Sequence, residues 1–368
     1  MQITAAVTRT AAGPFHIERL EVDVPREDEV LVRILGVGLC HTDLVARDQL
    51  VPVPLPAVLG HEGSGIVEEV GEGVTDLNPG DHVVLSFASC GDCPSCDIHI
   101  PGHCDTWLPL NFGGVRADGS KALAANGEPV ASHFFGQSSF ASHALANRRN
   151  TVKVRKDAPI ELLGPLGCGV LTGAGSIMSS LGCEAGSSLL ILGGGSVGLS
   201  AVLAAVVQGC QTIIVSEPTA ARRKLAVELG ATHTIDPMGT DDFVAEVRSM
   251  VPRGVNYILD TTGKATVISG AMAALDHRGA LGVVAIPATP DDMVLPVDVL
   301  GVLGHGLQIK GISEGDVDPQ TFIPGLIDLH LNGEFPFDKL IASYPLEEIN
   351  QAVEDQLNGL CVKPVLAP

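Results

Sequence analysis

The sequence of 368 residues predicts an α/β protein in which a Rossmann-type, doubly wound parallel sheet is inserted into a mainly β domain. Three observations carry this prediction. The first part of the chain reads as short β-rich runs separated by turns. After about Gly169 the chain alternates strand-like with helix-like runs, and a glycine-rich turn joins the first such strand to the first helix. A chain of this length is long enough to form two domains.

Short strands are expected in the first part at residues 30–37, 65–70 and 82–87, which are rich in β-branched side chains. The turn Asn78-Pro79-Gly80-Asp81 separates the last two strands. A polar, Gly-rich passage over residues 111–136 is expected to form a surface loop.

The second part alternates strand and helix signals, which implies right-handed βαβ units and a parallel sheet. Strands are expected at residues 188–192, 212–215, 257–259 and 281–286, with helices at 197–208 and 220–229. The tail from about Ser313, with a helical run at 346–357, is too short for a good core of its own. We therefore expect it to return to the first domain, which would comprise residues 1–169 and 313–368 around an inserted domain of 170–312.

The glycine-rich turn has the form G-x-G-x-x-G, with Gly193, Gly195 and Gly198 between the strand at 188–192 and the following helix. The first glycine permits the tight turn, the second lets the backbone approach a pyrophosphate, and the third allows close packing of helix on strand. The helix N-terminus favours the negative charge. The sequence therefore predicts a dinucleotide site.

Glu217 follows the next strand and lies 19 residues beyond Gly198. A carboxylate there can accept hydrogen bonds from both ribose hydroxyls and would repel a 2′-phosphate, so NAD is favoured over NADP. Arg222 and Arg223 are nearby and offer two interpretations. They could accommodate a 2′-phosphate, or they could lie on a solvated helix face.

Charge and composition exclude several classes of partner. The net charge of −21 argues against binding to nucleic acid or to an anionic membrane. No apolar run is long enough to span a bilayer, and residues 1–10 lack a basic region followed by an apolar one, so we expect no secretory signal. The clustered cysteines favour metal thiolates in a reducing cytoplasm over disulfides.

Four of the nine cysteines lie close together as Cys90-x2-Cys93-x2-Cys96-x7-Cys104. Four thiolates at such spacing can close a tetrahedral shell around one Zn²⁺ ion and leave no open position for chemistry. The segment 89–105 is therefore predicted to be a structural-zinc lobe. Three further cysteines are expected to be small buried hydrophobes, namely Cys183, Cys210 and Cys361.

The sequence resembles the zinc-dependent medium-chain alcohol dehydrogenase family over nearly its whole length. The motifs that carry the resemblance are Ala5-Ala6-Val7, Gly60-His61-Glu62-Gly63-Ser64-Gly65-Ile66-Val67, the four-cysteine lobe, Gly167-Cys168-Gly169, the glycine turn and Leu229-Gly230-Ala231-Thr232. The motif Cys40-His41-Thr42-Asp43, the segment 134–141 and the tail at 333–338 are most similar to microbial aryl-alcohol dehydrogenases. The resemblance implies that the first domain is GroES-like.

The resemblance also implies a second, catalytic Zn²⁺ ion held by Cys40, His61 and Cys168. Three protein ligands leave a fourth position for water or substrate. Two thiolates and one neutral imidazole give a formally neutral site that is still Lewis acidic enough to lower the pKa of an alcohol.

Three residues near these ligands match further catalytic positions of the family. Thr42 matches the hydroxyl residue that accepts the alcohol proton and passes it to the nicotinamide ribose. Asp43 and Glu62 match carboxylates that orient the ligand histidine or lie behind the metal. The sequence departs from some family members at Val45, where a histidine would extend the proton relay, so the relay must end at the ribose, a water chain or His41.

Other positions match residues around the cofactor or substrate. His41 matches a contact to the pyrophosphate, and Thr172 and Val197 match residues packed near the nicotinamide. Substrate-pocket candidates are Val51, Ser86 and Ile286, which are small or aliphatic and would leave room for a ring.

The resemblance implies a cytoplasmic homodimer or homotetramer that oxidises a primary aromatic (benzyl-type) alcohol to its aldehyde with NAD. Alternatives are a terpene alcohol such as geraniol, a medium-chain aliphatic alcohol, or a formaldehyde–glutathione adduct. The adduct would need cationic residues to hold its carboxylates, and none is evident. A non-enzymatic descendant of such an enzyme would be expected to lack metal ligands, whereas all seven are present. The apolar segment 299–307 is a candidate for a subunit interface.

Overall fold

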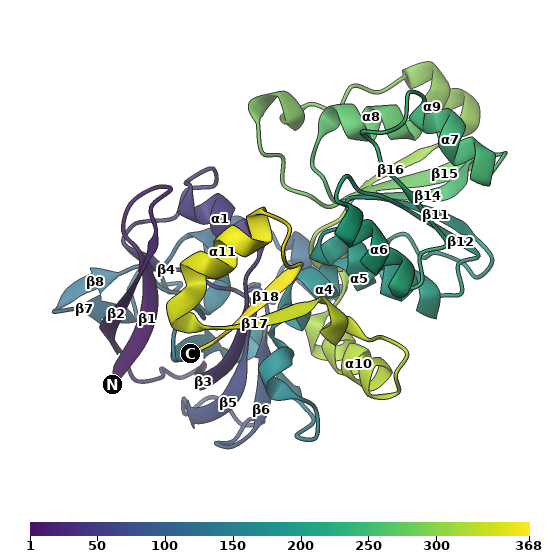
Figure 1. The fold of residues 1–368 in the computed structure, drawn as a ribbon. Helices are drawn as coiled ribbons and strands as arrows, with labels where there is room; N and C mark the ends of the chain where they lie inside the picture. Colours follow the sequence, from purple (N-terminus) through teal and green to yellow (C-terminus); the bar gives the residue numbers. More distant parts are fainter. The chain divides into compact units, whose positions relative to one another are not determined.

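The computed structural model describes residues 1–368, which form two compact units (Figure 1). Unit 1 comprises Met1–Leu171, Asp318–Asn332 and Asp338–Pro368, and unit 2 comprises Thr172–Val317 and Gly333–Phe337. The domain boundaries expected from the sequence stay a prediction, because a compact unit is not evidence of independent folding. No helix combines the length and the apolar character needed to cross a membrane.

Unit 2 contains one six-stranded sheet in the order β13-β12-β11-β14-β15-β16, and every neighbouring pair is parallel. Its strands are β11 (Ser188–Leu192), β12 (Thr212–Ser216), β13 (His233–Ile235), β14 (Val255–Asp260), β15 (Leu275–Val283) and β16 (Gln308–Gly311). Renumbered from β11, the order is 3-2-1-4-5-6, that of a doubly wound dinucleotide fold. The predicted fold class is thereby confirmed.

Helices lie on both sides of this sheet. They are α5 (Ser196–Val207), α6 (Ala220–Glu228), α7 (Phe243–Met250), α8 (Ala265–Met272) and α9 (Val299–His305). In Figure 1, α8 and α9 lie on one side of the sheet and α5 and α6 on the other. Every residue of β11 is buried, which explains its unbroken apolar run, because a parallel strand covered on both faces needs no polar alternation.

Unit 1 contains two sheets. The five-stranded sheet has the order β4-β1-β2-β7-β8, with β1 (Gln2–Thr8), β2 (Phe15–Val22), β4 (Ala57–Val58), β7 (Leu123–Ala125) and β8 (Glu128–Val130). The seven-stranded sheet has the path β10-β6-β5-β3-β18-β17, with β9 also paired to β3. Its strands are β3 (Glu29–Gly38), β5 (Gly63–Val70), β6 (His82–Leu85), β9 (His143–Asn147), β10 (Thr151–Val154), β17 (Ile341–Pro345) and β18 (Lys363–Ala367).

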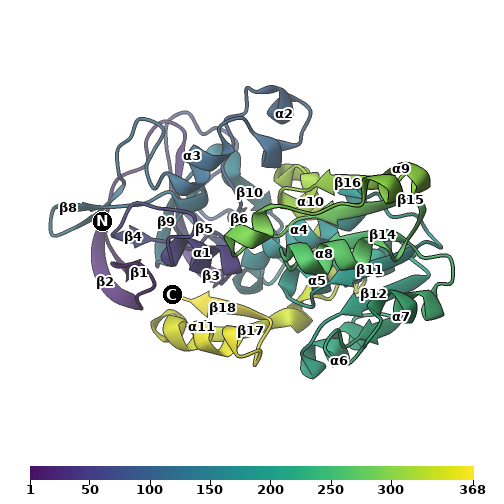
Figure 2. The same ribbon diagram turned by 90° about the horizontal axis from the view of Figure 1, so that it is seen from above.

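Unit 1 also contains helices. They are α1 (His41–Arg47), α2 (Pro94–Asp97), α3 (Trp107–Phe112), α10 (Pro319–Leu331) and α11 (Ile349–Leu357), while α4 (Gly169–Gly175) spans the boundary between the two units. The chain tail adds β18 antiparallel to β3 and β17 parallel to β18, so it completes the seven-stranded sheet (Figure 2).

The strand and helix predictions are mostly confirmed, with three corrections. The passage 111–136 is not a surface loop, since it holds the end of α3, β7, β8 and a short turn at Phe134–Gly136 whose two phenylalanines are almost fully buried. The strand expected at 281–286 is β15, which ends at Val283, so that Ile286 is 39% exposed. Of the three leftover cysteines only Cys183 is buried, while Cys210 and Cys361 are partly exposed.

Candidate metal and nucleotide sites

Strand pairing in unit 1 brings Cys40 and His61 together although they are far apart in sequence. β3 and β5 pair antiparallel, with Val37 opposite Gly63, so the chain just after β3 lies beside the chain just before β5. Cys40 is the N-cap of α1 in the first of these segments, and His61 is in the second. Cys168 comes from a third segment, which follows the short helix Gly164–Gly167.

The ligand atoms of Cys40, His61, Glu62 and Cys168 all lie within 4.8 Å of one another. His61 is fully buried and its Nε2 atom has no hydrogen-bond partner, whereas its Nδ1 atom is 2.9 Å from Oδ1 of Asp43. A buried polar atom without a partner is costly unless something else binds it. Two sulfurs and an unpartnered imidazole nitrogen are the donor set that Zn²⁺ prefers, so these residues fit such an ion.

The electrostatics of this cluster favour thiolates. A hydrogen bond from the Cys168 thiol, together with the charges of His61 and Lys363, holds the pKa of Cys40 well below its ordinary value, although burial opposes this. Metal binding needs the thiolate form, so the surroundings already favour the ligand state.

Lys363 is a site residue that the sequence interpretation missed. It is fully buried, and its Nζ atom is 2.9 Å from both carboxylate oxygens of Glu62 and 3.2 Å from the carbonyl oxygen of Leu39. Burial raises the pKa of Glu62. Burial is also the largest single influence on the pKa of Lys363 and acts to lower it, but the hydrogen bond and charge of Glu62 together with the charges of Cys40 and Cys168 outweigh burial and raise this pKa. Glu62 also accepts the backbone N–H of Gly169, so it links the two segments that carry His61 and Cys168.

Aromatic rings enclose the buried His61. Phe135 stacks on the imidazole with a centroid distance of 4.4 Å and an interplanar angle of 28°, and Phe134 meets it edge-on at 5.5 Å. Phe112 and Trp107 pack against these phenylalanines. The segment 134–141 carries part of the family resemblance, but nothing in its sequence indicates that two of its rings pack against His61.

The remaining residues of the motif Cys40-His41-Thr42-Asp43 lie at the start of α1. The Thr42 hydroxyl is 3.7 Å from the Cys40 sulfur and is partly exposed, and His41 is exposed. Asp43 is buried and accepts the backbone N–H groups of Cys40 and Gly60 as well as facing His61. Val45 is buried, so the position that would extend a proton relay holds an apolar core residue.

The three pocket candidates differ in exposure. Ser86 is fully buried and donates to the carbonyl oxygen of Gly167, so its hydroxyl is already engaged. Val51 is partly exposed, and Ile286 is exposed and belongs to unit 2.

The four cysteines of the lobe also converge, with their sulfur atoms within 4.8 Å of one another. Backbone N–H groups of Cys90 and Gly91 point at the sulfurs of Cys104 and Cys96, at 3.2 and 3.4 Å. Backbone hydrogen bonds from Asp105 and Cys96 lower the pKa of Cys93 to about 6. Four converging sulfurs with N–H donors around them fit a tetrahedral ion with no open position.

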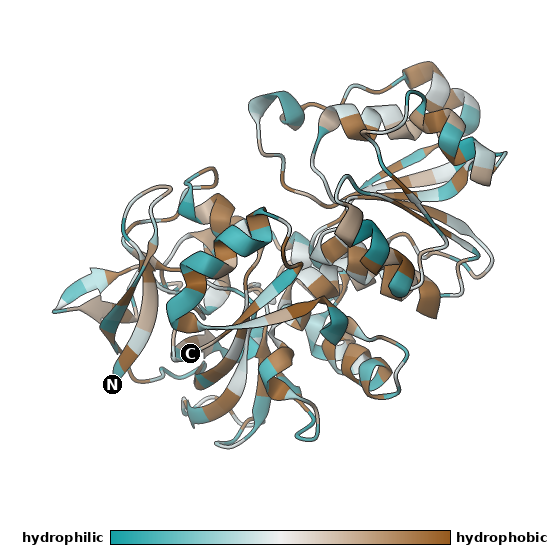
Figure 3. Ribbon diagram, in the orientation of Figure 1, coloured by the Kyte–Doolittle hydropathy of each residue, from teal (hydrophilic) through white to brown (hydrophobic).

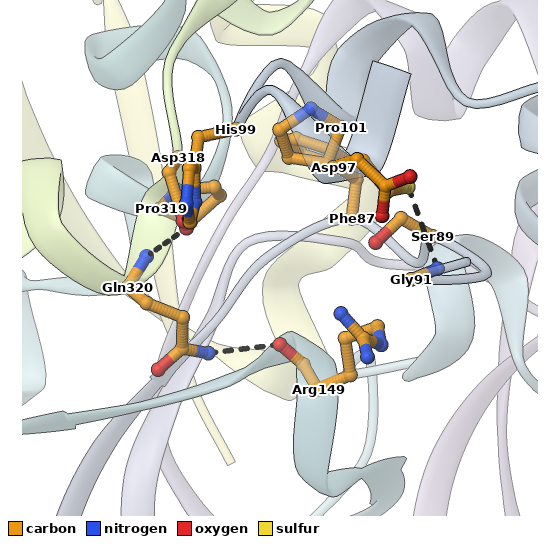
Figure 4. A pocket seen from close by; sticks show the side chains of 11 residues that line it. Phe87, Ser89, Gly91, Asp97, His99, Pro101, Arg149, Asp318, Pro319 and Gln320 are labelled. Atoms are coloured by element: carbon orange, nitrogen blue, oxygen red, sulfur yellow. Dashed lines mark hydrogen bonds and ion pairs between the residues drawn. The ribbon is translucent and has the colours of Figure 1, made fainter. Parts of the chain in front are cut away.

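A hollow of about 320 Å³ lies beside this lobe (Figure 4). Its wall includes His99, whose Nδ1 atom is 2.9 Å from Oδ2 of Asp318, and Gln320, which donates to the carbonyl oxygen of Arg149. The first contact joins the lobe to the residue before α10, and the second joins the start of α10 to the segment at Arg149. None of the residues predicted to be catalytic lines the hollow, so we assign it no role in the chemistry.

In unit 2 the glycine turn joins β11 to α5. Gly193 has a φ of +100°, which favours glycine. A Cβ atom on Gly198 would lie 2.0 Å from the carbonyl oxygen of Gly193, so helix and turn touch there, whereas a Cβ atom on Gly195 would meet nothing within 4 Å. Open space at the N-cap of a helix, between two glycines that the turn requires, fits a pyrophosphate.

The carboxylate of Glu217 is buried beside this turn. Its oxygens accept the backbone N–H groups of Gly194 and Thr219, at 2.7 and 2.8 Å. The Arg223 guanidinium donates to the carbonyl oxygens of Glu217 and Pro218 and pairs with Asp236, so it is engaged in structure.

The other predicted cofactor contacts in unit 2 lie in α4, α5 and α6. Arg222 lies in α6 and is engaged within the protein. Thr172 is buried and donates to Glu314, and Val197 is partly exposed in the first turn of α5.

Comparisons with known proteins agree with this geometry. Two family models match the chain, one described as an alcohol dehydrogenase GroES-like domain over residues 26–156 and one as a zinc-binding dehydrogenase over residues 196–331. A geraniol dehydrogenase from Castellaniella defragrans is 52% identical over 98% of this chain and 96% of that protein.

Two solved structures are similar to the whole chain. An alcohol dehydrogenase zinc-binding domain protein from Burkholderia ambifaria is 52% identical, with a TM-score of 0.97 over 100% of this chain and 99% of that one. A benzyl alcohol dehydrogenase from Acinetobacter calcoaceticus is 45% identical, with a TM-score of 0.96 over the same shares.

Proposed function

Since the chain belongs to the zinc-dependent medium-chain alcohol dehydrogenase family, we propose that it reversibly oxidises a primary benzyl-type alcohol to the aldehyde by hydride transfer to NAD. The observation that carries the proposal is the convergence of Cys40, His61 and Cys168 around an unpartnered imidazole nitrogen. These three residues would hold the catalytic ion, and the four cysteines of the lobe would hold a structural one.

When bound by Cys40, His61 and Cys168, Zn²⁺ supplies Lewis acidity that lowers the pKa of the alcohol hydroxyl. The protein residues fix the geometry. Asp43 engages Nδ1 of His61, so the ring presents Nε2 as the ligand atom. Glu62 does not need to be a ligand, because its carboxylate is already balanced by Lys363.

Proton removal from the alcohol is assigned to Thr42. Its hydroxyl is beside the ligand Cys40 and can accept one hydrogen bond while donating another, so it can take the alcohol proton and release its own. The side chain of Val45 cannot carry the proton further. The proton therefore passes to the nicotinamide ribose, a water chain or the exposed His41.

The cofactor proposed is NAD, which when bound accepts the hydride at its nicotinamide ring. The buried Glu217 carboxylate would accept from the ribose hydroxyls with lone pairs that its two backbone donors leave open. A 2′-phosphate would meet this negative charge, and Arg223 is already engaged elsewhere. Thr172 and Val197 are assigned to the surroundings of the nicotinamide, and His41 to the pyrophosphate.

The substrate class follows from two relatives whose names state different alcohols, benzyl alcohol and geraniol. In both alcohols the carbinol carbon is bonded to an sp² carbon, so the aldehyde product is conjugated. We propose that this chain shares that preference, with benzyl alcohol as the first candidate. Geraniol is the second, because its dehydrogenase is 52% identical to this chain.

The test is the absorbance of reduced nicotinamide with purified protein of measured zinc content. Benzyl alcohol, geraniol, 1-hexanol and ethanol are compared, each with NAD and with NADP. We expect kcat/KM for benzyl alcohol or geraniol to exceed that for ethanol at least about tenfold, since each buried methylene contributes on the order of 1 kcal/mol. Strong turnover of S-hydroxymethylglutathione, or none of any alcohol by protein with two zinc ions, would refute the proposal.

We also propose that the protein forms a homodimer or homotetramer in which α9 and β16 of unit 2 make the subunit interface. In α9, Val299, Leu300 and Leu303 are about three-quarters exposed, at 76%, 77% and 77%, and Figure 3 colours this helix mostly hydrophobic. β16 is the edge strand of the sheet and all four of its residues are exposed. Exposed apolar helices beside an open strand edge are typical of subunit interfaces.

A further inference from the structure

A continuous series of contacts connects the two groups of metal-ligand residues within unit 1. The backbone N–H of Trp107 donates to the carbonyl oxygen of the lobe ligand Cys104 at 2.9 Å. The Trp107 indole meets Phe135 edge-on, with centroids 5.6 Å apart at 89°. Phe135 in turn stacks on the ligand His61 at 4.4 Å. Only two side chains, those of Trp107 and Phe135, therefore separate the cysteine lobe from the Cys40–His61–Cys168 site.

The orientation of His61 depends on this contact. Asp43 engages only the Nδ1 atom, which leaves rotation about that hydrogen bond to be limited by the rings on either side. Phe135 covers one face of the imidazole, and Phe134 packs against it with the two ring planes nearly perpendicular, at 84°. Both phenylalanines are almost fully buried, so they have little freedom to follow a displaced ring.

The position of Trp107 depends in turn on the lobe. It begins α3, a helix of six residues, which is too short to be stable alone. The helix is held at its start by the Cys104 carbonyl and near its end by Asn111, whose side chain exchanges hydrogen bonds with the backbone of Ala88, two residues before Cys90. Loss of order in the lobe would release both ends of α3.

We propose that Trp107 and Phe135 are positioning residues that make metal binding at the Cys40–His61–Cys168 site depend on metal in the cysteine lobe. The inference rests on the ligand sets in the proposed function and deepens it. Because coupling between two binding sites is reciprocal, metal at the His61 site also stabilises metal in the lobe. Contiguous packed side chains with little freedom are the physical route for such coupling.

The first test measures zinc release to a chelating dye from the fully loaded protein. Substitution of residues around metal ligands commonly changes metal affinity 10- to 100-fold. We therefore expect Trp107→Leu to release the ion of the Cys40–His61–Cys168 site about tenfold faster than wild type. Trp107→Phe keeps a ring and should stay within about threefold of wild type. Leu108→Ala is the matched control, because Leu108 is in the same helix but is 58% exposed.

The main readout of the second test uses the wild-type sequence and needs no substitution. Trp107 is the only tryptophan in the sequence, so incorporation of 5-fluorotryptophan gives a single ¹⁹F resonance. With the lobe already loaded, addition of the second equivalent of Zn²⁺ should shift this resonance, and Phe135→Leu should reduce the shift. An unchanged resonance, or equal zinc release from Trp107→Leu and wild type, would overturn the proposal.

The readouts separate this inference from the proposed activity. If the wild type oxidises no alcohol but zinc release and the ¹⁹F signal respond as expected, the positioning role stands and the activity is wrong. If alcohol is oxidised but both signals are unaffected by the substitutions, the positioning role is wrong.

Discussion

Lys363 carries a full charge in the interior, and only its partner makes that tolerable. Glu62 and Lys363 are both fully buried, and the ammonium group contacts both carboxylate oxygens. Lys363→Met should therefore lower the free energy of unfolding by about 3–5 kcal/mol, the usual cost of leaving one buried charge unpaired. The midpoint of urea unfolding in zinc-loaded protein measures this.

The double variant Glu62→Gln with Lys363→Met is the control for that prediction. It removes both charges and keeps much of both volumes, so it should recover a large part of the loss. If the double variant is as unstable as the sum of the single variants, the two charges do not stabilise each other.

A second buried charge pair, Glu29 with Arg116, makes the free energy of unfolding depend on pH. Burial alone would raise the pKa of Glu29, but hydrogen bonds from His133, Arg116 and the Arg26 backbone lower it to about 2 from an ordinary value of 4.5. A carboxyl group whose pKa falls on folding contributes its full stabilisation of the folded state at pH values above its unfolded pKa. This stabilisation is lost as the pH falls towards the folded pKa.

We therefore expect Glu29→Gln to be less stable than wild type by about 2–3 kcal/mol at pH 7. The difference should shrink as the pH falls from about 4.5 towards 2, because the wild-type carboxylate itself becomes protonated. Urea unfolding of both proteins at matched pH values measures the difference directly. A difference that is constant over this range would mean that the charge of Glu29 does not matter.

Sequence reasoning at this scale indicates residues whose chemistry suits a site and misses residues whose place is decided by packing. Cys40, His61 and Cys168 have a recognisable residue type within a motif. Lys363 lies 301 residues from Glu62 and has no motif, because its place is decided when β18 pairs with β3. Trp107 and Phe135 read as ordinary apolar residues, since ring stacking leaves no local signature.

Among the elements, the turn between β11 and α5 contains one glycine that packing requires and one that we propose is required for binding. Gly198→Ala places a Cβ atom 2.0 Å from the Gly193 carbonyl oxygen, so helix and turn must separate. Overpacking of this kind costs about 1–3 kcal/mol, and NAD binding should weaken with it. Thermal unfolding and NAD titration measure the two effects.

Gly195→Ala is the matched variant for this prediction. Its Cβ atom would enter open space, and the φ of −78° suits alanine. Stability should change by less than about 1 kcal/mol, as for glycine-to-alanine changes at helix N-caps, while NAD binding weakens because the methyl group occupies the pyrophosphate position. Unimpaired NAD binding by this variant would place the pyrophosphate elsewhere.

The elements of unit 2 were easier to predict than those of unit 1. β11 and α5 show long, uniform patterns because a parallel sheet buries its strands on both faces. The passage 111–136 contains many turn residues, and its elements are only three to six residues long. Burial of Phe134 and Phe135 there follows from contact with His61, which no local pattern encodes.

At the scale of the whole molecule, the net charge opposes association between copies of the chain, whereas the exposed apolar face of α9 favours it. The chain carries −21 charges, so two copies repel, and only a sizeable apolar interface can hold them together. Salt screens repulsion between exposed charges over about 10 Å at 0.1 M and leaves apolar contact intact. Raising the ionic strength should therefore shift the protein towards the oligomer, as measured by light scattering after size-exclusion chromatography.

Leu303→Asp tests which surface is responsible. Leu303 is 77% exposed, so the substitution should not disturb the core of unit 2, but two interface copies would each bury an unpaired carboxylate at a cost of several kcal/mol. We expect monomers with an unchanged melting curve at low protein concentration. Leu360→Asp is the matched control, since Leu360 is 75% exposed and lies in unit 1. Oligomers that survive Leu303→Asp but not Leu360→Asp would place the interface on unit 1, and oligomers that survive both substitutions would exclude both surfaces.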